Sequence, residues 1–464
     1  MIPWWALLVV VFGVNVALWG LIGLLRLLDG ARRSWRSRPF RSARRRQNRR
    51  RQTERRQTRR WETSEPAAES AVGVGDVAVL IAAHDEQAVI ADSLEAIAGL
   101  VPRENVHVIS DGSTDDTVAV ARRCGVRVLS TRRNVGKAGA LQEGIRRFAL
   151  VQRFRVVMLL DADTQVRPGY FDAALPLFDD PEVVAVAGCV TTSWRGRGLS
   201  PVGRLVAFHR ERIYALTQHA IKFGQTWRRV NATHIVPGFA SLYRTAVLPE
   251  IEVNPPGLVI EDFNMTFEVY QKGLGRVGFT PRAVAATQDP GTLRDYVRQC
   301  RRWSLGLWQT VRRHPPRANL FSAMLGLMLL ELLTSSIVLV LLVLALLLVV
   351  VPEAVGLTAP PAVAGAVGPG PLLLGLVVPD AVLTCVVALF QRQPRFLLFG
   401  CCFLPMRVLD SVVALWAVIR AWTEGSSGRW RSPARSVAAA VDSGEGVAAR
   451  AEGASATRGG DIRS

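Results

Sequence analysis

Two carboxylates one residue apart, Asp161 and Asp163, follow the apolar run 156–160. Residues i and i+2 of a β-strand point to the same side, so both carboxylates are predicted to project together from a strand end. Carboxylate oxygens suit Mg²⁺ or Mn²⁺, and Mg²⁺ commonly shares its coordination sphere with phosphate oxygens. The pair therefore indicates chemistry on a nucleotide diphosphate. A solvated turn at a strand end gives the same pattern by chance, so the interpretation depends on the rest of the chain.

The segment from about residue 76 to residue 286 alternates between strand and helix patterns. Apolar β-type runs stand at 77–84, 106–110, 126–130, 155–160 and 183–190, with helical patterns between them at 88–99, 115–124, 137–151 and 168–178. Such alternation predicts an α/β domain with a mostly parallel sheet and helices on both faces.

Acidic residues fall where these predicted strands end. Asp85 follows the first strand and Asp111 the second, while Asp161 and Asp163 follow the fourth. Ligands of open α/β sheets bind beyond the carboxyl ends of the strands. We therefore expect these four side chains to lie near one ligand.

Composition excludes an ordinary soluble protein. The chain has 464 residues, 49% apolar content, a mean hydropathy of +0.21 and a net charge of +19. Residues 32–60 contain fifteen arginines and one acid, Glu54. Because this arm follows an apolar segment, the positive-inside rule places the amino terminus outside the cell and the arm in the cytosol. Contact with anionic lipid is the favoured role of the arm, and nucleic-acid binding is the less favoured alternative.

Four apolar runs could cross a bilayer. They stand at 3–28, 321–351, 372–390 and 396–420. The last run contains Pro405, Arg407 and Asp410, so it could be broken, re-entrant or lining a cavity. If it spans, the basic C-terminal tail lies outside; if it does not, the tail lies inside. An amphipathic helix that begins after Thr292 is expected at the membrane interface.

These patterns divide the chain into six regions. We expect an N-terminal transmembrane helix (1–30), a disordered cytosolic Arg-rich arm (31–75), a cytosolic α/β domain (76–290), an interfacial amphipathic helix (291–318), a C-terminal transmembrane region of about three segments (319–422) and a disordered tail (423–464). The six cysteines show no metal-binding or disulfide spacing and are interpreted as reduced packing residues.

Seven short motifs give the chain a family resemblance. They are IAAHDE (81–86), SDGSTDDT (110–117), GKAGAL (136–141), DAD (161–163), GFASLYR (238–244), IED (260–262) and QCRRW (299–303). Each is weak alone, but their order and spacing resemble those of the membrane-embedded family 2 glycosyltransferases, which include poly-N-acetylglucosamine, chitin-oligosaccharide, hyaluronan and cellulose synthases. The resemblance implies a GT-A-type, Rossmann-like catalytic domain.

The resemblance assigns the donor side of the site. Asp85, Asp111 and Lys137 would bind the nucleotide or its phosphates. Lys137 is one of only three lysines among 57 basic residues, and an ammonium there supplies a point charge where arginine would supply a planar fork. Asp161 and Asp163 would hold Mg²⁺ or Mn²⁺ on the donor diphosphate, and Asp161 could also contact the donor itself.

The resemblance also assigns the general base. In the family, the Asp of the Glu-Asp pair removes a proton from the acceptor hydroxyl, so Asp262 is expected to be the base and Glu261 to support it. Acidic residues at a helix start also act simply as partners of the helix dipole. Ile260 departs from the family pattern, which often has Thr before this pair.

The acceptor side is assigned to two segments. The segment that begins at 237 resembles the family's acceptor loop, through Gly238, Phe239 and Ala240. In Q-x-x-R-W, the i, i+3, i+4 spacing puts Gln299, Arg302 and Trp303 on one helical face. Trp303 and Gln299 would contact a sugar, and Arg302 would hold the donor diphosphate in a bidentate clamp.

The leading interpretation is a processive, inverting β-glycosyltransferase of the cell membrane, with a cytosolic catalytic domain, that polymerises sugar from a UDP-sugar and passes the polymer through its spans. N-acetylglucosamine is the favoured sugar. One alternative is single transfer to a lipid acceptor, and another is a non-catalytic polytopic scaffold. Expected partners are the UDP-sugar donor, a growing polysaccharide or glycolipid, the bilayer and accessory membrane or export subunits, but not nucleic acid.

Overall fold

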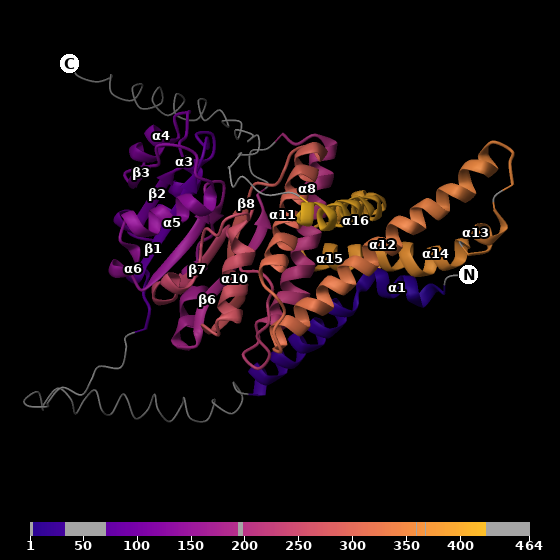
Figure 1. Ribbon diagram of the computed structural model, residues 1–464, viewed down its shortest axis with the longest axis horizontal. Coiled ribbons are helices and arrows are strands. Elements are labelled where there is room, and N and C mark those ends of the chain that lie inside the picture. Colours follow the sequence, from indigo (N-terminus) through magenta and orange to yellow (C-terminus); the bar gives the residue numbers. More distant parts are fainter. Residues whose placement is uncertain (1–2, 33–70, 194–197, 359, 367, 424–464) are drawn as a thin grey trace, which may run out of the picture.

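A computed structural model describes residues 3–32, 71–193, 198–358, 360–366 and 368–423. The expectations for the Arg-rich arm beyond Arg32 and for the tail beyond Thr423 lie outside these residues. Figure 1 shows an α/β domain on one side and a group of long helices on the other, with a layer of helices between them.

An eight-stranded sheet forms the centre of the α/β domain, in the order β3-β2-β1-β4-β7-β6-β8-β5. The strands are β1 (Val77–Ala83), β2 (Val106–Ser110), β3 (Arg127–Ser130), β4 (Val156–Asp161), β5 (Gln165–Val166), β6 (Val183–Thr192), β7 (Ala240–Arg244) and β8 (Arg276–Thr287). Five of them (β1 to β4 and β6) match the strands predicted from the sequence.

The sheet is mixed. Strands β3, β2, β1 and β4 are mutually parallel, as are β6 and β8, whereas β7 runs antiparallel to both β4 and β6, and β5 antiparallel to β8. The predicted α/β class is confirmed. The interpretation of 237–244 as an acceptor loop was wrong for Ala240–Arg244, because these residues form strand β7 in the middle of the sheet.

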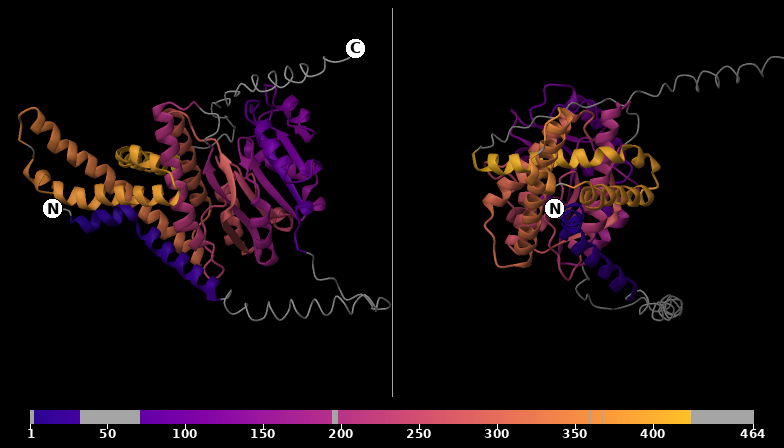
Figure 2. Two further views of the ribbon diagram at one scale, coloured as in Figure 1. Left: turned by 180° about the vertical axis from the view of Figure 1, so that it is seen from behind. Right: turned by 90° about the vertical axis from the view of Figure 1, so that its right-hand side faces the viewer.

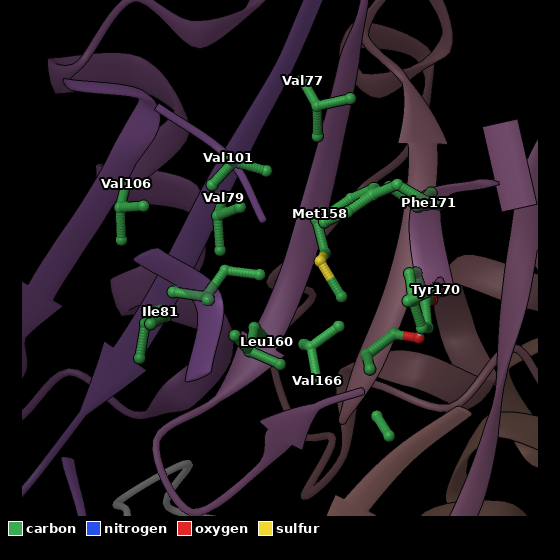
Figure 3. Close-up of a cluster of buried hydrophobic side chains, with 14 of the residues drawn as sticks. Val77, Val79, Ile81, Val101, Val106, Met158, Leu160, Val166, Tyr170 and Phe171 are labelled. Atoms are coloured by element: carbon green, nitrogen blue, oxygen red, sulfur yellow. The ribbon is translucent and has the colours of Figure 1, made fainter. Parts of the chain in front are cut away.

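Both faces of the sheet are buried, which explains the continuous apolar runs. Strand β1 is buried along its whole length: Val77, Val79 and Ile81 face one core, whereas Ala78 and Leu80 face the other. Figure 3 shows the first of these cores, where Met158 and Leu160 of β4 lie beside the β1 side chains. Helices α3 (Ile90–Ala98), α4 (Thr117–Arg123) and α7 (Tyr170–Ala174) pack on this face.

The opposite face is covered by α5 (Lys137–Arg147), α6 (Leu150–Arg153) and α10 (Glu261–Gln271). Helices α5 and α10 both begin at residues of the predicted site. The sheet therefore places the starts of two helices near the carboxyl ends of its central strands.

Three helices form the layer between the sheet and the long helices. They are α8 (Pro201–Ala215), which continues as a π-helix (Leu216–Lys222) and α9 (Phe223–Gln225), the predicted amphipathic helix α11 (Leu293–Arg313), and α16 (Gly400–Thr423). The right-hand view of Figure 2 shows α16 running across the direction of α12 instead of alongside it. Helix α16 packs extensively on α11.

Four helices among the described residues are long and apolar enough to cross a membrane: Val14–Arg32, Leu320–Ala354 (α12), Gly370–Phe390 and Pro394–Thr423. The last two contain α15 (Val378–Phe390) and α16, and α13 (Pro361–Ala366) and α14 (Pro369–Leu372) lie between α12 and α15.

The predicted N-terminal span is broken near its start. Helix α1 (Trp4–Phe12) ends at Gly13, whose φ of 74° is a left-handed conformation that favours glycine. The backbone N–H of Asn15 then donates to Glu331 of α12 (2.7 Å). A carboxylate in the neighbouring helix therefore satisfies a donor at the start of the second segment.

Candidate active site

Asp111 fixes the loop that leads into α5. Its carboxylate is completely buried and accepts hydrogen bonds from the backbone N–H groups of Val135 and Gly136 (both 2.8 Å) and from the Thr131 hydroxyl (3.1 Å). Burial raises the pKa of Asp111, and these three hydrogen bonds oppose the rise. Because Gly136 immediately precedes Lys137, Asp111 determines where α5 begins and where Lys137 lies.

Lys137 is the first residue of α5 and lies between two carboxylates. Its ammonium nitrogen is 2.7 Å from Oδ1 of Asp161 and 2.9 Å from Oε1 of Glu261. The ammonium outweighs the effect of burial at Glu261 and lowers the pKa of that carboxyl. Glu261 Oε1 is buried and accepts no well-aligned hydrogen bond, so its contact with Lys137 is an ion pair by distance alone.

The segment 236–240 forms hydrogen bonds both with β4 and with the start of α10. Asp161 N donates to the carbonyl oxygen of Phe239 (3.0 Å), and Ala240 pairs with Leu160 in the sheet. On the other side, Gly238 N donates to Oδ2 of Asp262 (3.3 Å). This segment therefore brings the predicted metal-binding strand end and the predicted base to one place.

Gly238 leaves the space that the ion pairs occupy. A Cβ atom at this position would lie 3.0 Å from both Glu261 Oε1 and Lys137 Nζ, closer than ordinary van der Waals contact. A side chain at 238 would therefore press on the two charged groups, which explains why the sequence has glycine there.

Asp262 carries the pKa expected of a general base. It lies in the first turn of α10, where Oδ1 accepts from Phe263 N (2.7 Å). Burial, and then the neighbouring Glu261 carboxylate, raise its pKa to about 7, against the opposing effect of Lys137. A carboxylate with a pKa near the working pH transfers protons efficiently.

The charges around Lys137 suit a divalent cation. Asp163 and Glu261 both act electrostatically on Asp161, whose pKa is raised by burial despite the ammonium of Lys137. Two carboxylates thus contact the one ammonium, and Asp163 adds a third negative charge near Asp161. The described residues hold no cluster of three or more His, Cys, Asp or Glu side chains that could bind a metal by themselves. Mg²⁺ is usually held by one or two carboxylates together with phosphate and water oxygens, and the pair Asp161 and Asp163 matches that number of protein ligands.

Asp85 lies at the neighbouring strand end. It has a positive φ of 52°, and its Oδ1 accepts from Thr114 N (2.7 Å), so it fastens the loop after β1 to the loop after β2. Both Asp85 and Asp111 therefore hold loops at the predicted nucleotide side, and their contact with a nucleotide stays a prediction.

The Q-x-x-R-W residues lie on α11, next to α10. Gln299 and Trp303 are half-buried and Arg302 is exposed. Trp303 packs with Ile260 and Phe263 in one apolar cluster, and Arg302 acts electrostatically on Glu261. The predicted acceptor face of α11 therefore adjoins the residues that flank the Glu261–Asp262 pair.

A glycine permits this close approach. A Cβ atom at Gly306 would lie 2.9 Å from the side chain of Ile260. Ile260 thus fills the contact between α10 and α11, which gives a packing reason for the residue that departs from the family pattern.

Comparison with known proteins is consistent with this geometry. The profile of the family described as "Glycosyltransferase like family 2" matches residues 75–306, half of the chain. This chain is a family 2 glycosyltransferase. The matched segment covers the sheet, the ion-pair cluster and the Q-x-x-R-W motif, and the family assignment made from the motifs is confirmed.

Two curated relatives match this glycosyltransferase over a similar length. It is 30% identical over 250 residues to an uncharacterized glycosyltransferase, YaiP, of Escherichia coli K12, and 24% identical over 253 residues to a poly-beta-1,6-N-acetyl-D-glucosamine synthase of Staphylococcus epidermidis. Each match covers 52% of this chain and 58% of the relative. The matched region therefore spans less than two thirds of these relatives.

Solved structures of glycosyltransferases also match. One is a mannosyltransferase from Pyrobaculum calidifontis in complex with GDP-Man and Mn²⁺, with 19% identity and a TM-score of 0.45 over 79% of this chain and 93% of that one. Another is glucosyl-3-phosphoglycerate synthase from Mycobacterium tuberculosis with Mn²⁺, UDP-glucose and phosphoglyceric acid, with 20% identity and a TM-score of 0.34 over 51% of this chain and 79% of that one.

Sequence reasoning missed the contribution of α8. This helix carries four consecutive buried polar residues, His209 to Arg212. His209 contacts Asp410 of α16 (2.9 Å), Arg212 forms an ion pair with Asp380 of α15, and Arg210 reaches Gln299 and Trp303. In the sequence, a run of four polar residues resembles a solvated helix face. It gives no sign that the residues are buried between the α/β domain and the long apolar helices.

Proposed function

We propose that this glycosyltransferase is a processive, inverting enzyme that transfers a sugar, N-acetylglucosamine by preference, from a UDP-sugar to the end of a growing polysaccharide. The observation that carries the proposal is the meeting of Lys137, Asp161, Glu261 and Asp262 at one edge of the sheet, beside the Q-x-x-R-W face of α11. A helix layer then joins this edge to the apolar helices.

On the donor side, Lys137 and Arg302 bind the diphosphate. Arg302 is exposed, and its guanidinium can form a bidentate contact with phosphate oxygens. Asp161 and Asp163 would hold Mg²⁺ or Mn²⁺, which when bound would neutralise charge on the departing diphosphate. Asp111 holds the loop before Lys137, and Asp85 holds the adjacent loop that faces the nucleotide.

On the acceptor side, Asp262 removes the proton from the attacking hydroxyl group. The hydroxyl oxygen forms a bond to the anomeric carbon as the bond from that carbon to the UDP oxygen breaks, so UDP leaves with the electron pair and Asp262 holds the proton. A single displacement inverts the anomeric centre and needs no covalent enzyme intermediate. Glu261 raises the basicity of Asp262 and keeps Lys137 in place.

Trp303 provides the stacking surface for the terminal sugar of the acceptor. Its ring lies in the cluster that includes Phe321, at the start of α12. A chain held at Trp303 therefore lies close to the first apolar helix after the catalytic domain. This proximity favours extension of a polymer that enters the membrane, and single transfer to a lipid acceptor is the second candidate.

The helix arrangement supports the proposed orientation in the membrane. The helix Val14–Arg32 ends on the sheet side, where Arg26 donates to the carbonyl oxygens of Phe223 and Phe279. We place the sheet in the cytosol and α1 toward the opposite face of the cell membrane. If α16 lies along the interface on α11, three of the four candidate helices in the described residues cross, and the chain leaves α16 at Thr423 on the cytosolic side. The basic tail then obeys the positive-inside rule.

The test is UDP release by the purified full-length enzyme in detergent, with a panel of nucleotide sugars and Mg²⁺ or Mn²⁺. We expect release with UDP-N-acetylglucosamine and a β-linked oligomeric product. An Asp262→Asn variant serves as the control and should form almost no product. A parent enzyme that binds none of these donors would contradict the proposal.

A further inference from the structure

Arg210 lies against the predicted acceptor-binding residues. It belongs to α8, is only 3% exposed, and its guanidinium carbon is 4.3 Å from the ring centroid of Trp303 and 4.6 Å from that of Tyr296. Both distances are within the range of cation–π contacts. One side of the Trp303 ring is therefore covered by a guanidinium group.

The same guanidinium determines how the Gln299 amide is oriented. Nη2 of Arg210 donates to Oε1 of Gln299 (2.8 Å) and to Sγ of Cys300 (3.3 Å). Arginine has only donors, so Gln299 must present its oxygen to it. The amide nitrogen of Gln299 then points elsewhere, and within the described residues it has no hydrogen-bond partner.

The groups in direct contact with the Arg210 guanidinium are uncharged. No carboxylate among the described residues forms an ion pair with Arg210, and its Nε donor is buried without a partner. Asp289 acts electrostatically on Arg210 without a direct ion pair, so the desolvation of the buried guanidinium is offset only from a distance. A fold that needed only packing here would be better served by an apolar side chain.

We propose that Arg210 is a positioning residue for the acceptor. It covers one face of Trp303, so that a sugar stacks only on the opposite face. It also fixes Gln299 so that the amide nitrogen donates to an oxygen atom of the terminal sugar. This inference rests on the proposed function, because it concerns the acceptor of that same reaction.

Two substitutions separate positioning from simple packing. Arg210→Met keeps the length of the side chain but removes the charge and the donors. Gln299→Glu keeps the shape and gives Arg210 a carboxylate partner, yet removes the amide donor. If Gln299 served only to satisfy Arg210, Gln299→Glu would be fully active. We expect instead that both variants raise the KM for an oligosaccharide acceptor about tenfold or more.

The readout separates acceptor use from donor chemistry. Transfer to a defined oligosaccharide and hydrolysis of the UDP-sugar by water are measured with each variant, because water needs neither a stacking surface nor an amide donor. For Arg210→Met, the KM for the UDP-sugar and the hydrolysis rate should stay within about twofold of the parent. Arg210→Lys, which can donate to Gln299 but lacks the planar group, should recover part of the loss.

Arg212→Met is the matched control for loss of α8 packing. Arg212 is equally buried on the same helix but pairs with Asp380. The Arg212→Met variant should have a lower thermal stability than the parent, with an unchanged ratio of transfer to hydrolysis. In a double-mutant cycle, Arg210→Met and Gln299→Glu should be clearly non-additive.

Two results overturn different claims. Unchanged acceptor KM in both Arg210→Met and Gln299→Glu, with an active parent, overturns the role of Arg210 alone. A parent enzyme that transfers no sugar from any donor overturns the proposed function itself. If Arg210→Met does not insert into membranes, Arg210→Lys and Gln299→Glu still decide the matter, because both keep a polar group of similar size.

Discussion

The ammonium nitrogen of Lys137 lies 2.7 Å from Oδ1 of Asp161, so a carboxylate predicted to hold a divalent cation already carries a positive partner. Two cations on one carboxylate repel each other. Binding of the metal together with the donor should therefore move the Lys137 ammonium from Asp161 toward the diphosphate. In this account Lys137 keeps the site ordered until the donor arrives.

Lys137→Met should separate donor binding from metal binding. Loss of a charge-assisted contact should weaken UDP binding roughly tenfold to a hundredfold, since such a hydrogen bond contributes about 1.5–3 kcal/mol. Affinity for Mn²⁺ alone should stay the same or increase, because a competing cation is removed. Calorimetric titrations with UDP and with Mn²⁺ measure both effects. Lys272→Met, which removes an ion pair between the exposed Lys272 and the buried Glu268, is the control. Weaker Mn²⁺ binding in Lys137→Met would contradict this account.

Asp163→Ala should abolish turnover. The protein should still insert and fold, because Asp163 lies just beyond the end of β4 and belongs to neither sheet core. Turnover is measured as UDP release with Mg²⁺ or Mn²⁺, and the same assay in excess EDTA should show no activity in the parent. Full activity of the parent in EDTA would exclude a metal at Asp161 and Asp163.

The rate of transfer should depend on a group with a pKa of about 7. Burial and Glu261 raise the pKa of Asp262 to that value, and the base must be deprotonated to act. The rate should therefore rise with pH below about 7 and level off above about 8. Asp262→Asn should lower the transfer rate by about two to four orders of magnitude while donor affinity is kept. If Asp262→Asn lost affinity for the donor but transferred sugar from the bound donor at the parent's rate, Asp262 would not be the base.

The raised pKa of Asp262 also predicts that Asp262→Asn is more stable to thermal unfolding than the parent. The folded pKa of Asp262 lies above its ordinary value of 3.8, so the folded protein holds this proton more tightly than the unfolded chain. Stability from protonated Asp262 is therefore lost as the pH rises through about 7. Asp262→Asn should have a higher Tm than the parent at pH 8, and the difference should shrink at pH 5. Equal Tm values at pH 8 would argue that the ionised carboxylate is not disfavoured in the folded protein.

The membrane arrangement predicts which ends are accessible. Single cysteines placed at Trp4 and at Thr423 in a cysteine-free enzyme should react with an impermeant thiol reagent from opposite sides of oriented membranes. Trp4 should react from outside and Thr423 only after the cytosolic side is opened. Labelling of both from outside would mean that α16 crosses the bilayer.

Much of the fold could be predicted from the sequence. Strands buried on both faces have long apolar runs, and these located β1, β2, β3, β4 and β6. Strand β7 escaped prediction because its five residues, Ala240–Arg244, include polar Ser241 and a terminal Arg244. The break in the N-terminal helix was not predicted either. It involves a contact between Asn15 and Glu331, which lies more than 300 residues away in the sequence.

The site was predictable in its members but not in its contacts. Motif order indicated Lys137, Asp161 and Glu261, yet only the structure shows that one ammonium lies between the two carboxylates. Arg210 could not be predicted, because an arginine in a charged run carries no sign of the aromatic rings that it meets in the fold.

A pulse–chase measurement of product length tests directly whether the enzyme extends one chain processively. The purified enzyme receives radiolabelled UDP-N-acetylglucosamine with excess oligosaccharide acceptor, followed by unlabelled donor, and the products are sized at short times. A processive synthase with Trp303 at the entrance to the apolar helices should give long β-linked labelled chains while most acceptors remain unextended. Products that are each longer by one sugar, or a labelled lipid with a single sugar, would contradict the claim and favour single transfer.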